Sequence, residues 1–91
     1  MAAEQGDSRG QDDLGRMYEF GFGVEQSWET AAEYYRLSAD QEDPDGLYDL
    51  GCLFLDGLGV EESREKAIEL FRLAAELGSE DARQELLILG E

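Results

Sequence analysis

The sequence predicts an all-α protein, an α-solenoid of about two and a half helix–turn–helix repeats with antiparallel helix pairs. The first observation is an internal repeat: residues 14–25 return as residues 50–61, a period of 36 residues. A fixed period of this length is typical of stacked repeat proteins. The second observation is that apolar residues follow helical spacing, without the alternation of a strand. We expect a single domain over residues 1–91, with repeat 1 at about 3–38, repeat 2 at about 39–74 and a partial repeat 3 at about 75–91.

The first repeat is expected to contain two helices. One is predicted over about residues 8–20, where Asp7 or Ser8 caps the free N–H groups of the first turn. The other is predicted over about residues 28–40, because Ser27 is placed to cap it and the apolar residues that follow have helical spacing.

Glycine-rich turns are expected to join the helices within each repeat. Gly21-Phe22-Gly23 suits a tight turn with positive φ whose central side chain points inward. Residues 57–60 repeat this turn one period later. Before the first repeat helix, residues 1–5 are in register with the end of the helix predicted at 64–77, so they are expected to be the tail of a helix. Gly6 can end this helix by adopting the left-handed conformation.

The same signals predict the later helices. Asp43 is expected as an N-cap and Pro44 as the first helical residue. Aspartate is a preferred capping residue, and proline is favoured at the first position of a helix. Small residues at the same phase of each repeat indicate positions where helices approach closely, since glycine inside a helix costs about 1 kcal/mol relative to alanine. The remaining helices are expected over about 44–56, 64–77 and 79–89, with Ser63 and Ser79 at the starts, Gly78 as a stop and Gly10, Gly15, Ala31, Gly46, Gly51, Ala67 and Ala82 at the packing positions.

These residues resemble the Sel1-like repeat family, a relative of the tetratricopeptide repeats. The resemblance implies helix–turn–helix units stacked into a curved superhelix, and an adaptor that holds other proteins in bacteria. Some members look like immunity proteins for secreted toxins. The sequence departs from the family pattern at Gly10, Asp12, Glu42 and Gly46. The residues that match the pattern are Leu14, Gly15, Tyr18, Gly21, Gly23, Val24, Ala31, Tyr35 and Ala39, and then Leu50, Gly51, Phe54, Gly57, Gly59, Val60, Ala67, Phe71, Ala74, Ala75 and Gly78.

The composition restricts the class of partner. The chain has 23 acidic and 7 basic residues and a formal net charge of -16. Such a charge opposes binding to nucleic acid or to an anionic membrane and favours a basic protein partner. The N-terminal residues lack the pattern of a signal peptide, no apolar run approaches a membrane span, and the single cysteine needs no oxidising compartment. We therefore expect a cytoplasmic protein.

Catalysis and cofactor binding are not expected. The sequence has no histidine and one cysteine, so the usual bases, nucleophilic pairs and imidazole ligands are missing. The acidic segment 40–45 does not fit the ligand pattern of a calcium-binding loop. The adjacent carboxylates at 12–13 and at 61–62 point apart on a helix and do not form a catalytic pair.

A protein-binding groove is the leading functional hypothesis. In stacked helix pairs the first helix of each pair usually lines the concave side. Helical spacing then predicts a partly apolar strip with acidic neighbours, which suits a basic segment. The alternative is that these side chains pack against neighbouring helices. The residues assigned to the groove are Asp12, Arg16, Glu19, Asp45, Tyr48, Cys52, Leu55 and Ile88.

The last helix suggests a second kind of contact. Leu87 and Leu89 lie in an apolar run, so they either fold into the terminal core or stack on another copy of the chain. Three functions stay open: an adaptor that holds a basic segment, an acidic inhibitor or immunity protein that blocks a nucleic-acid-binding enzyme or toxin, and a structural or designed repeat unit that associates with itself.

Overall fold

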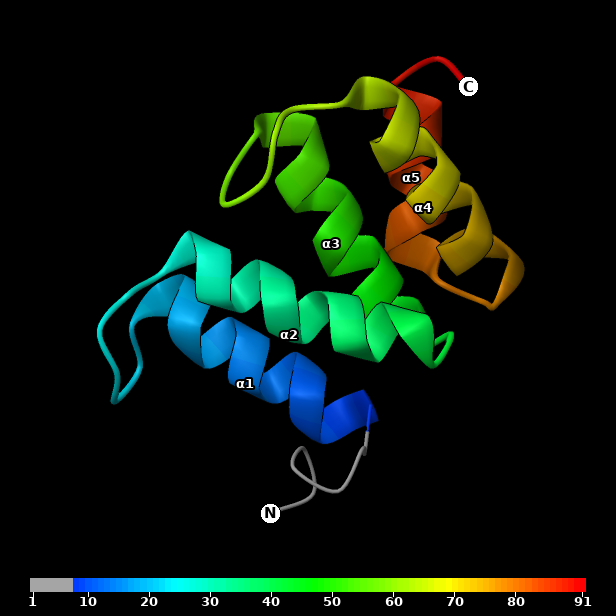
Figure 1. The fold of residues 1–91 in the computed structure, drawn as a ribbon. Coiled ribbons are helices and arrows are strands. Elements are labelled where there is room, and N and C mark those ends of the chain that lie inside the picture. Colours follow the sequence, from blue (N-terminus) through cyan, green and yellow to red (C-terminus); the bar gives the residue numbers. More distant parts are fainter. Residues whose placement is uncertain (1–7) are drawn as a thin grey trace.

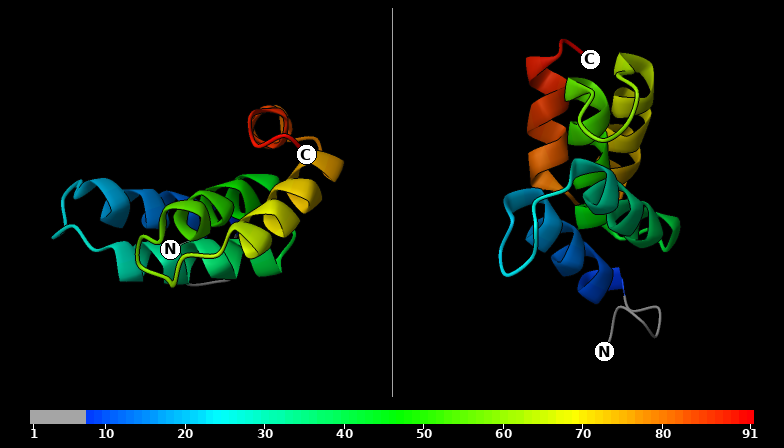
Figure 2. Two further views of the ribbon diagram at one scale, coloured as in Figure 1. Left: turned by 90° about the horizontal axis from the view of Figure 1, so that it is seen from above. Right: turned by 60° about the vertical axis from the view of Figure 1, so that its left-hand side comes forward.

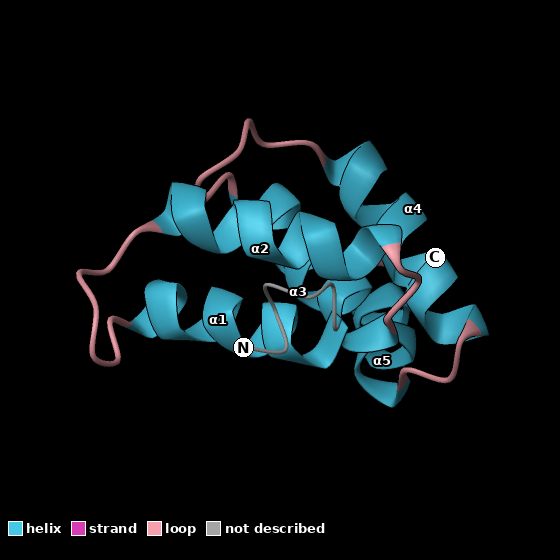
Figure 3. Ribbon diagram, turned by 60° about the horizontal axis from the view of Figure 1, so that its bottom comes forward, coloured by secondary structure: helices cyan, strands magenta, loops and turns pink. Residues whose placement is uncertain are grey.

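The computed structural model describes residues 8–91, which form α-helices joined by turns, with no strand in that range (Figures 1 and 3). The all-α prediction is therefore confirmed, and the predicted helix limits agree with the structure to within one residue. The helix tail predicted for residues 1–5 lies outside the described residues. The helices are α1 (Ser8–Phe20), α2 (Trp28–Asp40), α3 (Pro44–Asp56), α4 (Arg64–Glu76) and α5 (Glu80–Ile88).

Short polar side chains begin the helices as the sequence predicts. Ser27 Oγ accepts a hydrogen bond from the Thr30 N–H at 3.1 Å, and Ser63 and Ser79 make the equivalent bonds at the starts of α4 and α5. Asp43 accepts from the N–H of Asp45 at 2.9 Å. Each bond satisfies an N–H group that has no partner inside the helix, and such caps contribute about 1 kcal/mol each.

Consecutive helices pack against each other along the chain, α1 on α2, α2 on α3, α3 on α4 and α4 on α5. As a result α1, α3 and α5 lie along one side of the molecule, while α2 and α4 lie along the other (Figure 2). We call the first side the odd-helix face and the second the even-helix side.

The core is built from an aromatic ring placed over a glycine in each repeat. Tyr35 on α2 and Phe71 on α4 are both 0 % exposed. A Cβ atom at Gly15 would lie 2.5 Å from the Tyr35 ring, and one at Gly51 would lie 2.7 Å from the Phe71 ring. These glycines therefore give the room that lets the two helices of a repeat approach, as the sequence predicted.

The two glycine turns have the same backbone but different surroundings. Gly23 and Gly59 have φ of 75° and 74°. A Cβ at Gly59 would lie 2.3 Å from the Trp28 carbonyl oxygen, whereas a Cβ at Gly23 would meet nothing within 4 Å. The turn of the second repeat thus packs on the start of α2.

The inward orientation predicted for Phe22 is wrong. Its side chain is 64 % exposed and stacks on the Phe20 ring with centroids 5.5 Å apart. The repeat-equivalent Leu58 does pack against the core. The difference arises because the second turn lies on the helix of the preceding repeat, and no such helix lies under the first turn among residues 8–91.

Candidate functional site

The odd-helix face carries two clusters of ionisable side chains, one between α1 and α3 and one between α3 and α5. In the first cluster, Arg16 Nη2 lies 3.3 Å from an oxygen of Asp12 and 3.3 Å from an oxygen of Asp49. Asp12 is one turn before Arg16 on α1, whereas Asp49 belongs to the second repeat. Arg16 therefore bridges two repeats on this face.

Burial changes the protonation of this cluster. Desolvation, a hydrogen bond to Asp12 and the charge of Asp12 together raise the pKa of Asp49 to about 8, while Arg16 opposes the shift. Desolvation also raises the pKa of Asp12. Burial lowers the pKa of Arg16, but the charges of Asp49 and Asp12 outweigh it, so its net shift is upward and its guanidinium stays charged.

Glu19, a predicted groove residue, is held inside the first repeat. Its carboxylate accepts a hydrogen bond of 2.5 Å from the hydroxyl of the buried Tyr35. Desolvation raises the pKa of Tyr35, and the hydrogen bond to Glu19 adds to that shift, so the hydroxyl keeps its proton and donates it. Glu19 therefore fixes α1 to α2.

The second cluster surrounds Tyr48 and Cys52 on α3. Desolvation and the charges of Asp49, Glu85 and Asp56 together raise the pKa of the Cys52 thiol to about 12, while a hydrogen bond with Tyr48 opposes the shift. Desolvation also raises the pKa of Tyr48. Its neighbour Cys52 and the charges of Glu85 and Asp81 on α5 add smaller shifts in the same direction. The thiol is protonated at neutral pH and is a poor nucleophile. What this cluster offers is a phenol and a thiol among carboxylates.

The predicted placement of Asp12 in an open groove is wrong. Asp12 is 3 % exposed and lies at the contact between α1 and α3. The repeat-equivalent Tyr48 is half-buried, with its ring 5.8 Å from that of Phe71. The side chains of Asp12 and Tyr48 therefore face neighbouring helices and not an open groove. The angle at which the repeats pack turns this position of the helix inward.

The other predicted groove residues differ in accessibility. Asp45 and Arg16 are exposed, and Ile88 is 75 % exposed at the end of α5. Leu55 and Cys52 are half-buried and pack against the core. The structure therefore brings Asp45, Tyr48 and Cys52 together on α3 and leaves Ile88 at one end.

Leu87 and Leu89, predicted as a self-association pair, point in different directions. Leu87 is 73 % exposed. Leu89 packs against the core, and its carbonyl accepts a hydrogen bond from Arg64 at 2.7 Å. The assignment of Leu89 to a self-association surface is therefore wrong, because it closes the terminal core.

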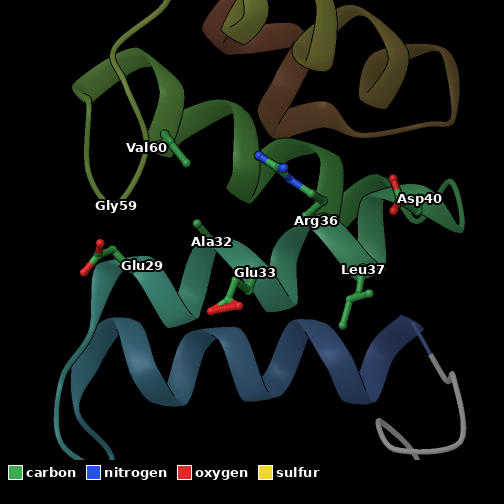
Figure 4. Close-up of a pocket in the computed structure, with 8 residues that line it drawn as sticks. All are labelled: Glu29, Ala32, Glu33, Arg36, Leu37, Asp40, Gly59 and Val60. Atoms are coloured by element: carbon green, nitrogen blue, oxygen red, sulfur yellow. The ribbon is translucent and has the colours of Figure 1, made fainter.

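A hollow on the even-helix side was not expected from the sequence. It has a volume of about 530 Å³ and lies between α2 and the glycine turn of the second repeat (Figure 4). A second hollow of about 400 Å³ continues between α2 and α4 over Leu47, Leu50 and Phe54. The sequence feature that could have indicated these hollows is the pair Leu37 and Leu73, which occupy the same position of the two repeats. Both side chains are about half exposed and line the hollows.

Comparison with known proteins identifies the family. The family model described as Sel1 repeat matches residues 8–43 and 44–79. The chain belongs to the Sel1 repeat family. The resemblance seen in the sequence is thereby confirmed, and Sel1 repeat proteins generally act as protein–protein interaction scaffolds.

Solved Sel1 repeat structures share the fold closely. A Sel1 repeat protein from Oxalobacter formigenes is 36 % identical with a TM-score of 0.92, over 94 % of this chain and 65 % of that chain. Cysteine rich protein B from Helicobacter pylori is 36 % identical with a TM-score of 0.89, over 93 % and 64 %. The protective antigen c5321 of uropathogenic Escherichia coli is 34 % identical with a TM-score of 0.90, over 93 % of this chain and 18 % of that chain. This Sel1 chain thus spans less than two thirds of each of these proteins.

No curated protein matches this Sel1 chain. The Sel1 repeat family is typically a non-enzymatic interaction fold. Within residues 8–91, no helix is long and apolar enough to cross a membrane. The same residues contain no group of three or more potential metal-ligating side chains placed to hold an ion.

Proposed function

We propose that this Sel1 repeat protein is an adaptor that binds a basic, partly apolar segment of another protein on its odd-helix face. The observation that carries the proposal is the second cluster, in which Tyr48 and Cys52 lie beside the carboxylates of Asp81 and Glu85 on α5. Carboxylates on one face attract lysine and arginine side chains and raise the rate of association with a basic partner. The half-buried phenol and thiol supply the apolar part of the contact.

Two matched double variants test this face. Asp45 and Asp81 are exposed acids in the first turns of α3 and α5, and Glu29 and Glu65 occupy the same helical position in α2 and α4. Changing either pair to lysine alters the net charge and the helix termini equally. We expect Asp45→Lys with Asp81→Lys to weaken binding at least about tenfold, because it places like charges against the partner. Glu29→Lys with Glu65→Lys should leave binding within about threefold of the wild type.

The measurement is affinity capture at low and high salt, followed by titration of the captured protein with each variant. The adaptor is supported if salt releases a basic partner and if only the variant with Asp45→Lys and Asp81→Lys, on the odd-helix face, loses binding to it. If only the variant with Glu29→Lys and Glu65→Lys loses binding, the partner site lies on the even-helix side, at the hollow between α2 and α4. If the captured protein is an enzyme whose activity falls on mixing, the acidic-inhibitor hypothesis replaces the adaptor.

Self-association is a second candidate, favoured by one observation on α5. Leu87 occupies the repeat position of Gly15 and Gly51, and neither Leu87 nor Ile88 is covered by the described part of the chain. A leucine at this position cannot accept a ring as the glycines do, so it presents an apolar surface instead. Two such surfaces can pack against each other once salt screens the acidic charge.

Sedimentation equilibrium at raised salt tests this candidate. We expect the wild type to exceed the monomer mass as concentration rises, because pairing buries Leu87 and Ile88. Leu87→Gln with Ile88→Gln should remain monomeric, since both side chains are exposed and their replacement leaves the core intact. A wild type that is monomeric at every concentration would exclude self-association through α5.

A further inference from the structure

The contact between Asp12 and Asp49 is a carboxyl pair that joins the two repeats. Asp12 is 3 % exposed, and the side chain of Asp49 is 15 % exposed. One Arg16 Nη2 atom lies 3.3 Å from an oxygen of each carboxyl, so the two carboxyls meet beneath the same guanidinium. A hydrogen bond between them raises the pKa of Asp49 and lowers that of Asp12. Two ionised carboxylates only accept hydrogen bonds, so a bond between them needs a proton on one of the two. The buried Oδ1 atom of Asp12 receives no hydrogen bond from an N–H or hydroxyl group of residues 8–91.

We propose that Asp12 and Asp49 share one proton beneath Arg16, and that this proton clamps the first repeat to the second. With the proton present, the three side chains carry one negative and one positive charge and are neutral together. Without it, two carboxylates share one guanidinium in a site that water scarcely reaches. A buried pair of like charges is costly, and one of its members is normally protonated.

The surroundings of the pair hold the proton in place. Asp45 and Asp43 add negative potential at Asp12, and Glu19 adds it at Asp49. Arg16 is the cation that acts on both carboxyls. Titratable and charged groups from three elements surround the pair. They are Asp12, Arg16 and Glu19 on α1, Tyr35 on α2, and Asp43, Asp45, Asp49 and Cys52 at the start of α3 and along it. Glu85 of α5 acts on Cys52.

The clamp makes stability depend on pH in a defined direction. In the unfolded chain Asp49 ionises near its ordinary value of about 3.9. In the folded chain it holds its proton to about 8. The folded state therefore binds one more proton than the unfolded state between these limits, so stability falls as pH rises through this window and levels off above it.

Denaturant unfolding at about pH 6 and about pH 9 tests the clamp, because few groups of this histidine-free chain titrate between them. We expect the wild-type folding constant to fall at least about tenfold from the lower to the higher pH, equivalent to about 1.4 kcal/mol. In Asp49→Asn the amide N–H replaces the shared proton at every pH, so this variant should keep only the smaller fall, about fourfold, that comes from ionisation of Cys52 in the unfolded chain. It should exceed the wild type in stability at about pH 9. Asp12→Asn should reduce the fall equally, since its amide donates to an ionised Asp49.

A control variant and a direct titration complete the test. Asp13→Asn removes one exposed charge beside Asp12 on α1 and should keep the wild-type fall. The carboxyl ¹³C resonance of Asp49 in the wild type should move well above the pH range of the exposed aspartates. A wild type equally stable at both pH values, an Asp49→Asn variant that keeps the full wild-type fall, or an Asp49 resonance that moves only near pH about 4 would each overturn the clamp. The inference does not depend on the proposed partner.

Discussion

Replacing Phe71 with alanine is expected to lower the free energy of unfolding by about 3–5 kcal/mol. Phe71 is 0 % exposed, lies against Gly51 and packs with the Tyr48 ring at a centroid distance of 5.8 Å. Removing the ring leaves a cavity where α3 and α4 meet, and the glycine opposite has no side chain to fill it. A chain of this length has about 5–14 kcal/mol of stability in total, so the variant should lie close to the unfolding limit.

Urea unfolding followed by circular dichroism measures this effect. Leu73→Ala is the matched control, because it shortens an apolar side chain two residues later on the same helix. Leu73 is 49 % exposed, so its truncation should cost less than about 1.5 kcal/mol. Equal losses in the two variants would contradict the central role of the Phe71 ring.

Changing Gly59 to alanine is expected to cost about 1–3 kcal/mol more than changing Gly23 to alanine. Both glycines have a positive φ, 74° and 75°, so both substitutions carry the same backbone strain of about 1–2 kcal/mol. Only Gly59 has a close neighbour, since its new Cβ would meet the Trp28 carbonyl oxygen at 2.3 Å. The backbone of one repeat would then have to move away from the other.

The difference between the two unfolding free energies isolates the contact between repeats. The two positions are equivalent in the repeat and have the same conformation, so the shared strain cancels. Equal destabilisation by the two variants would show that the second turn does not pack on α2 as closely as the structure places it.

The helices and turns were predictable because the signals for them are local. Ser27, Ser63 and Ser79 each accept a hydrogen bond from an N–H three residues later, and this pattern is visible in the sequence. The period of 36 residues indicated which elements are equivalent, and the match to the Sel1 repeat family confirms that interpretation.

The candidate site was predictable only in part. Helical spacing placed Asp45, Tyr48 and Cys52 on one side of α3, and the structure has Tyr48 and Cys52 beside the carboxylates of α5, while Asp45 acts on Asp12 of α1. The same spacing placed Asp12 in the open, where the structure buries it. Spacing gives the direction of a side chain around its own helix, but it does not give the angle at which the next repeat packs.

The sequence by itself thus determined the helix limits, the glycine turns and the acidic character of the chain, since these depend on neighbouring residues and on composition. Only the tertiary structure decided that Asp49 meets Asp12 across 37 positions, that Phe22 points outward, and that Leu89 closes the core while Leu87 stays exposed. The physical reason is the same in each case. These outcomes depend on how one repeat packs against the next, where Gly46 lies close to Ser38 and Gly59 lies close to the Trp28 backbone.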